Sequence, residues 1–244
     1  MISLILITTG IIFVASIIRS ALGFGEALIA MPLLVMILGL STATPVVGLV
    51  AVTLSIIILQ KDWHFADFKL TWRLVLSSLL GVPIGLLMLK GVADELMQGL
   101  LGIVLIAYGL YKLVKPEHRL KEDRFGLVYI LGFFSGILGG AYNTNGPLVV
   151  IYANLRRWPP QQFRSTMQSY FLPIGLFTMI GQGVAGLWTI KVITLYLSSL
   201  PLIFLAVYIG RKVHMSFAPH RFDRIISTVL LLMGLLLIVR VLMN

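Results

Sequence analysis

Ten apolar segments run through this chain of 244 residues, and most of them are close to 20 residues long. A helix needs about 20 residues to cross the hydrocarbon core of a bilayer. Charged residues make up only 11% of the chain, against about 25% in soluble domains. The pattern predicts an all-α polytopic membrane protein whose main partner is the lipid bilayer. The segments cover residues 2–18, 21–39, 42–60, 72–90, 95–114, 126–141, 143–155, 165–184, 189–210 and 225–243.

The positive charges follow a regular pattern along the chain. Cationic loops of membrane proteins stay on the cytoplasmic side. Two apolar segments separate each basic loop from the next, so all the basic loops can lie inside together. This arrangement predicts that both termini are on the outer side, and it accounts for the net charge of +10 without a nucleic-acid partner. Fifteen of the 19 Lys and Arg residues fall in four loops, at residues 61–73, 112–124, 156–164 and 211–224.

One apolar segment in each half carries glycine, polar residues and a proline. The first lies at residues 20–34, and the second follows at a shift of 115 positions, which aligns Gly25 with Gly140 and Pro32 with Pro147. A pair of glycine- and proline-interrupted segments at corresponding positions is the best pointer in a sequence to the substrate site of a transporter. We therefore expect an internal repeat with a binding site between these two segments.

The repeat predicts the domain organisation. We expect a first membrane repeat over residues 1–115, a cytoplasmic linker at 116–124 and a second membrane repeat over 125–244. Five segments per half is an odd number, so the two repeats must be inverted relative to each other. Segments 126–141 and 143–155 are short for a full crossing, which favours broken or re-entrant helices shielded by protein or lining a wet cavity.

Glu26 is the only carboxylate within an apolar segment, and the other eight acids lie in or beside loops. An acid inside a membrane is a functional candidate by default. Because loss of water disfavours its charged form, Glu26 is a candidate to exchange a proton during a transport cycle. The alternative is an acid near a helix N-terminus that pairs with Arg19 at the cytoplasmic mouth. Both interpretations stay open.

The second interrupted segment holds a polar cluster of Asn143, Thr144 and Asn145. Amides and hydroxyls can donate hydrogen bonds to an anion without bringing a full opposite charge. A half-helix beginning nearby would add free backbone N–H groups that favour oxyanions. Gln168 on the next segment is expected to point inward. The other interpretation is polar packing between helices, with glycine allowing close approach.

We therefore expect a small anion near the midplane, held by backbone N–H groups around Gly25 and Gly140 and by the side chains of the polar cluster and Gln168. Gln182 is interpreted as a residue near the outer face. The chain has no cysteine, and its four histidines all lie in the basic loops. These features predict neither a metal site nor a cofactor.

Two motifs resemble those of the TauE/SafE sulfite exporter family, also called the toluene-sulfonate uptake permease family. The resemblance covers essentially the whole chain. It implies a bacterial inner-membrane permease, not an enzyme, that moves sulfite, an organosulfonate or a related oxyanion without a cofactor. The chain differs from many members in having Glu26 and the stretch at 141–147 in place of small residues and a run of glycines. The matching motifs are Gly23-Phe24-Gly25 leading to Pro32-Leu33-Leu34, and Ser135-Gly136-Ile137-Leu138-Gly139-Gly140 leading to Pro147.

The function expected on all these grounds is secondary transport of a small anion, with a homodimer left open as the assembly. Two alternatives remain. The first is a transporter of a different solute, such as a metal cation. The apolar segments contain one carboxylate and no histidine, which makes them poor ligands for a metal cation. A non-transporting scaffold would need neither broken helices nor a polar cluster at mid-depth.

Overall fold

The computed structural model describes residues 2–114, 125–156, 158–214 and 219–243, so the expected linker at 116–124 lies outside the described residues. Within them every regular element is a helix, which confirms the all-α prediction. Their order follows that of the ten apolar segments. The helices are α1 (Ile2–Leu22), α2 (Glu26–Leu38), α3 (Leu40–Asp62), the 3-10 turn η1 (Trp63–Phe65), α4 (Phe68–Gly91), α5 (Asp94–Val114), α6 (Phe125–Tyr142), α7 (Gly146–Leu155), α8 (Pro160–Val184), α9 (Ile190–His214) and α10 (Pro219–Met243).

The helices fall into two classes of length. Among the described residues, five helices (α1, α3, α4, α5 and α9) contain an apolar span long enough to cross a membrane. Helices α2 and α7 have only 13 and 10 residues, or roughly 20 and 15 Å of helix. Neither can cross a hydrocarbon core of about 30 Å alone. Each short helix follows directly on a longer one, so each half contains a broken pair, α1–α2 and α6–α7.

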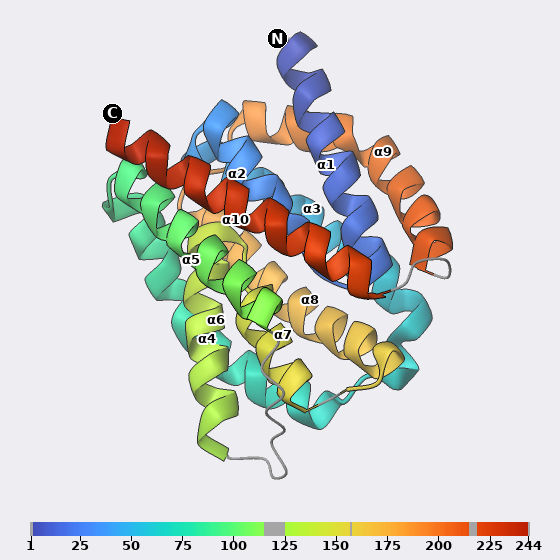
Figure 1. The fold of residues 1–244 in the computed structure, drawn as a ribbon. Helices are drawn as coiled ribbons and strands as arrows, with labels where there is room; N and C mark the ends of the chain where they lie inside the picture. Colours follow the sequence, from blue (N-terminus) through green and yellow to red (C-terminus); the bar gives the residue numbers. More distant parts are fainter. Residues whose placement is uncertain (1, 115–124, 157, 215–218, 244) are drawn as a thin grey trace.

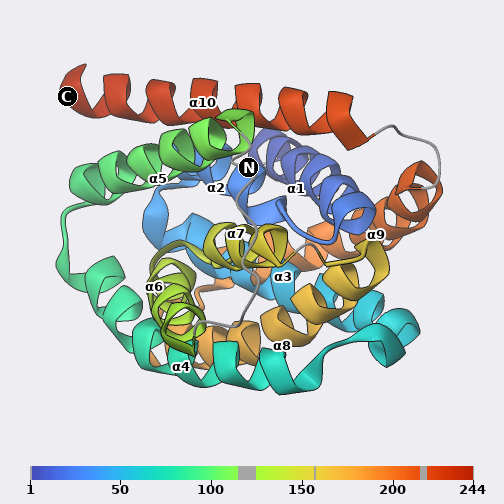
Figure 2. The same cartoon turned by 60° about the horizontal axis from the view of Figure 1, so that its bottom comes forward.

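The main helix contacts join the two halves. Helix α4 packs along α6, α1 along α9, α5 along α10 and α3 along α8. In the view of Figure 2, α10 and α4 lie on opposite sides of the molecule with α3 and α7 between them. The core therefore forms between the halves rather than within each half.

The α3–α8 pair runs antiparallel. A Cβ atom on Gly48 would lie 2.9 Å from Gln182 Oε1, and Val52, one turn later in α3, comes within 3.0 Å of the Cβ position of Gly175, earlier in α8. The α5–α10 pair is also antiparallel. Gly102 of α5 contacts Gly234 of α10, and Gly109, further along α5, contacts Leu231, which comes before Gly234 in α10.

Glycines bring α4 and α6 unusually close. A Cβ on Gly136 would lie 2.8 Å from the Cα and carbonyl carbon of Ser78 and would overlap its oxygen. Gly81 and Gly140 face the opposite backbone in the same way. Small residues at a crossing allow two membrane helices to approach this closely, so the backbones of α4 and α6 pack against each other beside the second break.

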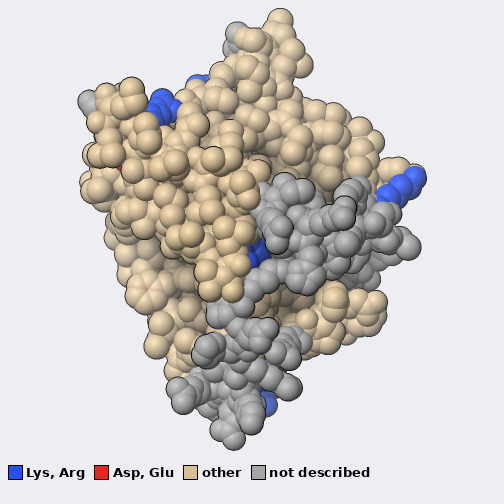
Figure 3. Space-filling view, viewed as in Figure 1, with Lys and Arg blue, Asp and Glu red and all other residues tan. Residues whose placement is uncertain are grey.

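The outer surface is suited to lipid. Large apolar side chains on several helices are well exposed, among them Leu80, Leu87, Phe204 and Leu235. Figure 3 shows one face of the molecule, on which the described residues are mostly uncharged, with Lys and Arg only in small patches. The described chain is a multi-pass membrane protein with many of its polar side chains buried inside.

Candidate functional site

Both broken helix pairs are interrupted by a three-residue stretch that contains left-handed backbone. Helix α1 ends at Leu22, after which Gly23 has φ +87° and Gly25 has φ +100°. Helix α6 ends at Tyr142, and Asn143 follows with φ +52°. Glycine and asparagine are the residues that adopt this conformation at least strain. Gly23 and Asn143 are 120 positions apart (143 − 23), so the breaks correspond at a shift five residues longer than that of the glycine-proline motifs.

A small cavity lies between the two breaks. The centre of a water-sized molecule can move within a volume of about 20 Å³ in this cavity. The cavity therefore has room for one water molecule. The first turns of α2 and α7 both contribute to its wall, and no side chain caps either helix N-terminus. Uncapped first turns leave backbone N–H groups available. The lining residues are Arg19, Phe24, Gly25, Glu26, Ala27, Leu28, Asn143, Thr144, Asn145, Gly146, Pro147 and Phe171.

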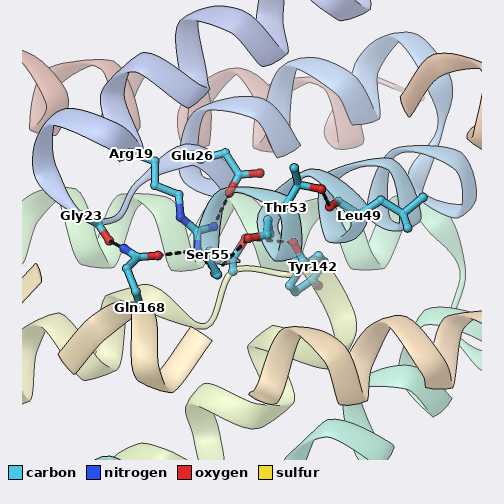
Figure 4. A network of polar contacts seen from close by, with 10 residues as sticks. Arg19, Gly23, Glu26, Leu49, Thr53, Ser55, Tyr142 and Gln168 are labelled. Atoms are coloured by element: carbon cyan, nitrogen blue, oxygen red, sulfur yellow. Dashed lines mark hydrogen bonds and ion pairs between the residues drawn. The ribbon is translucent and has the colours of Figure 1, made fainter. Parts of the chain in front are cut away.

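Arg19 and Glu26 form a buried ion pair at this cavity. The two side chains are 5% and 2% exposed, and Nη1 of Arg19 donates to Oε2 of Glu26 at 2.7 Å. The other terminal nitrogen of Arg19 donates to Ser55 Oγ at 2.5 Å and to Gln168 Oε1 at 3.1 Å. Figure 4 shows how these groups from α1, α2, α3 and α8 converge on the guanidinium. The Glu26–Arg19 pair that the alternative interpretation describes is present, and it is enclosed by protein.

The same network fixes the backbone of the first break. Gln168 Nε2 donates to Gly23 O at 2.5 Å, so one amide contacts both the break and Arg19. The guanidinium carbon of Arg19 lies 4.8 Å from the centre of the Phe171 ring, a cation–π arrangement. Lys112 Nζ is 5.2 Å from the centre of the Phe24 ring. Two buried cations thus lie near the aromatic walls of the cavity.

Hydrogen bonds to α3 and α6 hold the second break. Asn143 Nδ2 donates to Thr44 O on α3 at 2.6 Å, and Thr144 Oγ1 donates to Tyr142 O at 3.0 Å. Ser135 Oγ donates to Asn145 O, and it accepts a hydrogen bond from Tyr170 OH at 2.9 Å. These bonds satisfy backbone that is not helical at this depth, as a low-dielectric setting requires.

The structure gathers most of the sequence-predicted site residues. Gly25, Glu26, Asn143, Thr144 and Asn145 line the cavity. Gln168 reaches it through Arg19.

The position of Gly140 is different. It lies inside α6 and faces Val82 and Gly85 of α4, and it is not among the lining residues. The need for glycine there follows from helix packing.

Arg19 was not among the predicted site residues and was named from the sequence only as an alternative partner for Glu26. Its position at the end of an apolar segment is typical of a boundary residue, and only the return of α2 encloses it. The signal available in the sequence was Glu26, seven residues away and without another partner in its segment.

No ligand set for a metal ion is present in the part of the chain that the structure describes, since no three His, Asp or Glu side chains come together there. The polar groups around the cavity are instead mostly hydrogen-bond donors: a guanidinium, two amides, a hydroxyl and two helix N-termini. Such a set suits an oxyanion better than a cation.

Comparisons with known proteins agree with this chemistry. A family model described as "Sulfite exporter TauE/SafE" matches residues 8–237. A protein from Cupriavidus necator named "Probable sulfite/organosulfonate exporter TauE" is 24% identical over 222 residues, which cover 88% of this chain and 86% of the relative. No solved structure matches the chain significantly.

Proposed function

The chain belongs to the TauE/SafE sulfite exporter family, and on this premise we propose that it is a secondary transporter that moves sulfite or an organosulfonate across the cytoplasmic membrane of a bacterium. The Cupriavidus necator relative carries a name of the same meaning. The family model spans residues 8–237, a range that contains both breaks.

The cavity between the two half-helix N-termini is the observation that carries the proposal. Each N-terminus is equivalent to roughly half a positive charge, Arg19 adds one and Glu26 removes one. For these lining groups the sum is about +1 before a solute arrives, and Lys112, beside Phe24 but not itself lining the cavity, adds a further positive charge nearby. A site with net positive charge favours an anion such as a sulfonate or bisulfite. Three sulfonyl oxygens can accept from Arg19, Asn145 and the free N–H groups of α2 and α7.

The charge balance also gives Glu26 its proposed role. When Glu26 takes up a proton, Arg19 loses its partner and the sum rises to about +2. The site would then attract a more highly charged anion or bind a monoanion more tightly. Proton exchange at Glu26 would in this way couple the movement of protons to that of the anion.

The cavity is too small for the solute, so this conformation corresponds to a closed state of the transporter. A space of about 20 Å³ holds one water, and a sulfonate group is several times larger. Binding of the solute would therefore require α2 and α7 to separate. This is the alternating movement expected of a site between two repeats.

The helix directions support inverted halves. A two-fold axis in the membrane plane would make each helix antiparallel to its own equivalent, and this is the arrangement of the pairs α3–α8 and α5–α10. In Figure 1 both ends of the chain lie in the upper part of the view, while α6 begins at the bottom. With the basic loops inside, this arrangement favours both termini on the outer side.

The test is transport by the purified protein in liposomes loaded with ³⁵S-labelled sulfite or a labelled sulfonate. The expected result is efflux faster than from loaded liposomes without protein. Unlabelled sulfonate should inhibit the efflux of sulfite, and unlabelled sulfite that of the sulfonate. Asn145→Ala should raise the KM about tenfold, since one hydrogen bond to a charged group contributes roughly 1.5 kcal/mol or more. The matched control is Asn154→Ala, at the exposed end of the same helix α7. Absence of any anion movement with well-folded protein would refute the function.

A further inference from the structure

Buried polar residues of α3 and α8 face each other where the two helices cross, next to Asn143. Thr44 and Gly48 are one turn apart on α3, and Thr178 and Gln182 are one turn apart on α8, so each pair lies on one helix face. The two faces touch, because a Cβ on Gly48 would lie 2.9 Å from Gln182 Oε1. The amide of Asn143 is 3.1 Å from the same point. We call Thr44, Asn143, Thr178 and Gln182 the outer polar cluster.

The outer polar cluster has polar atoms without partners. Gln182 is 0% exposed, and neither the nitrogen nor the oxygen of its amide makes a hydrogen bond. The hydroxyls of Thr44 and Thr178 are buried and unpaired in the same way. Leaving such groups unsatisfied in an apolar medium destabilises the fold. A packing role does not explain this arrangement, because an apolar side chain at position 182 would pack without the cost.

We propose that the outer polar cluster is a second binding position for the transported oxyanion, located between the cavity and the outer surface. Its amide and hydroxyl donors match the oxygens of a sulfonyl group, and Asn143 borders both positions. This inference rests on the proposed function, because the same solute occupies the two positions in turn.

The chemistry of the two positions differs in the way a transport path requires. Arg19 and the half-helix N-termini offer positive charge, whereas the outer polar cluster offers only neutral donors. A neutral donor lacks the Coulomb attraction that a guanidinium adds to its hydrogen bond with an anion, so the solute is held less tightly by the outer polar cluster. A path conducts when each position binds well enough to be entered and weakly enough to be left. Asn143 lines the cavity and also lies beside Gly48 and Gln182, so the two positions are adjacent.

Gly48 keeps the space between the two amides clear. A methyl group there would lie about 3 Å from the ends of the Asn143 and Gln182 side chains. These ends are flexible, so the fold can accept the change while the methyl group fills the gap between the donors. Gly48→Ala is therefore a steric test of the position, and Gln182→Met is a chemical one.

The experiment measures three quantities for each purified protein: melting temperature in detergent, sulfite affinity by calorimetry, and efflux rate of ³⁵S-sulfite from liposomes. Gln182→Met should melt at the same or a higher temperature, because an unpaired amide is replaced by an apolar chain of similar size. Its efflux should fall about tenfold, by the loss of donors to a charged solute. Affinity at the Arg19 cavity should be unchanged.

The matched controls are Gln161→Met, on an exposed turn of the same helix α8, and Gly10→Ala, where a Cβ meets nothing within 4 Å. Both should transport like the original protein, while Gly48→Ala should be slow. If Gln182→Met keeps the original efflux rate, the cluster holds only water and the second position is refuted. A joint fall of efflux and melting temperature would show a structural role and would refute it equally. If the original protein moves no sulfite or sulfonate at all, the proposed function itself fails, which is a separate result.

Discussion

Removing Arg19 or Glu26 alone should cost far more stability than removing both together. Both side chains are enclosed, and the 2.7 Å bond between them is the contact that compensates each charge. Arg19→Met leaves the Glu26 carboxylate buried without a counter-charge. Breaking a buried pair in this way costs about 3–5 kcal/mol. At roughly 2–4 °C per kcal/mol for a chain of this size, the melting temperature should fall by about 6–20 °C.

The double variant Arg19→Met/Glu26→Leu should recover most of this loss. Replacing a whole buried pair by apolar residues is often neutral or stabilising. Two other partners of Arg19 limit the recovery. Ser55 keeps its bond to Ala51 O at 2.9 Å. Gln168 keeps the hydrogen bond that its Nε2 donates to Gly23 O. Its Oε1 loses the hydrogen bond from Arg19, which lowers stability by about 1–3 kcal/mol. The double variant should therefore melt within a few degrees of the original protein.

The assay is thermal unfolding of the original protein, both single variants and the double variant in one detergent at one pH, followed by efflux in liposomes. The folded double variant should transport no anion, because the guanidinium that would bind the solute is gone. Additive losses of stability in the double variant would refute the coupled ion pair. Normal efflux by the double variant would show that Arg19 does not bind the solute.

Three further predictions concern the breaks and the close helix crossing. Gly136→Ala should lower stability by about 1–3 kcal/mol by overpacking, because its methyl group would overlap Ser78 O. Gly126→Ala in the same helix meets nothing within 4 Å and should raise stability by about 0.5–1 kcal/mol. The melting temperatures of the two variants test this difference. Gly25→Ala should cost about 1–2 kcal/mol because its φ of +100° is left-handed, and a melting temperature equal to that of the original protein would contradict this. Glu26→Gln should abolish anion-dependent proton movement in liposomes containing a pH-sensitive dye, and unchanged proton movement would exclude Glu26 as the proton carrier.

Much of the helix order could be predicted from the sequence, because hydrophobic length and loop charge are local properties. The ten apolar segments correspond one to one with ten described helices. The two breaks were also predicted, since glycine and proline act on the backbone where they occur. The register of the breaks was less accessible. Pro32 lies inside α2 and Pro147 in the first turn of α7, so matching prolines do not mark matching turns.

The polar interior could be predicted only in part. Asn143 and Thr144 stood out because they interrupt an apolar run. Arg19 and Gln182 lie near segment ends, where polar residues are usually interfacial. The burial of Arg19 depends on the return of α2, and that of Gln182 depends on the glycine opposite it on α3. Such contacts between distant segments leave no periodic pattern in the sequence.

The distribution of polar contacts suggests where a transport movement would occur. At the α4–α6 crossing, backbone meets backbone through glycines, and sliding there would lose close packing along several turns. At the α3–α8 crossing, by contrast, Gln182 and Thr178 have no hydrogen bonds to lose, so separation would let solute or water satisfy them. Opening at α3–α8 would also release the break at Asn143, whose amide is held by α3. Movement of α3 against α8 would thus open the way from the cavity to the outer polar cluster while the glycine-packed pairs move as rigid bodies.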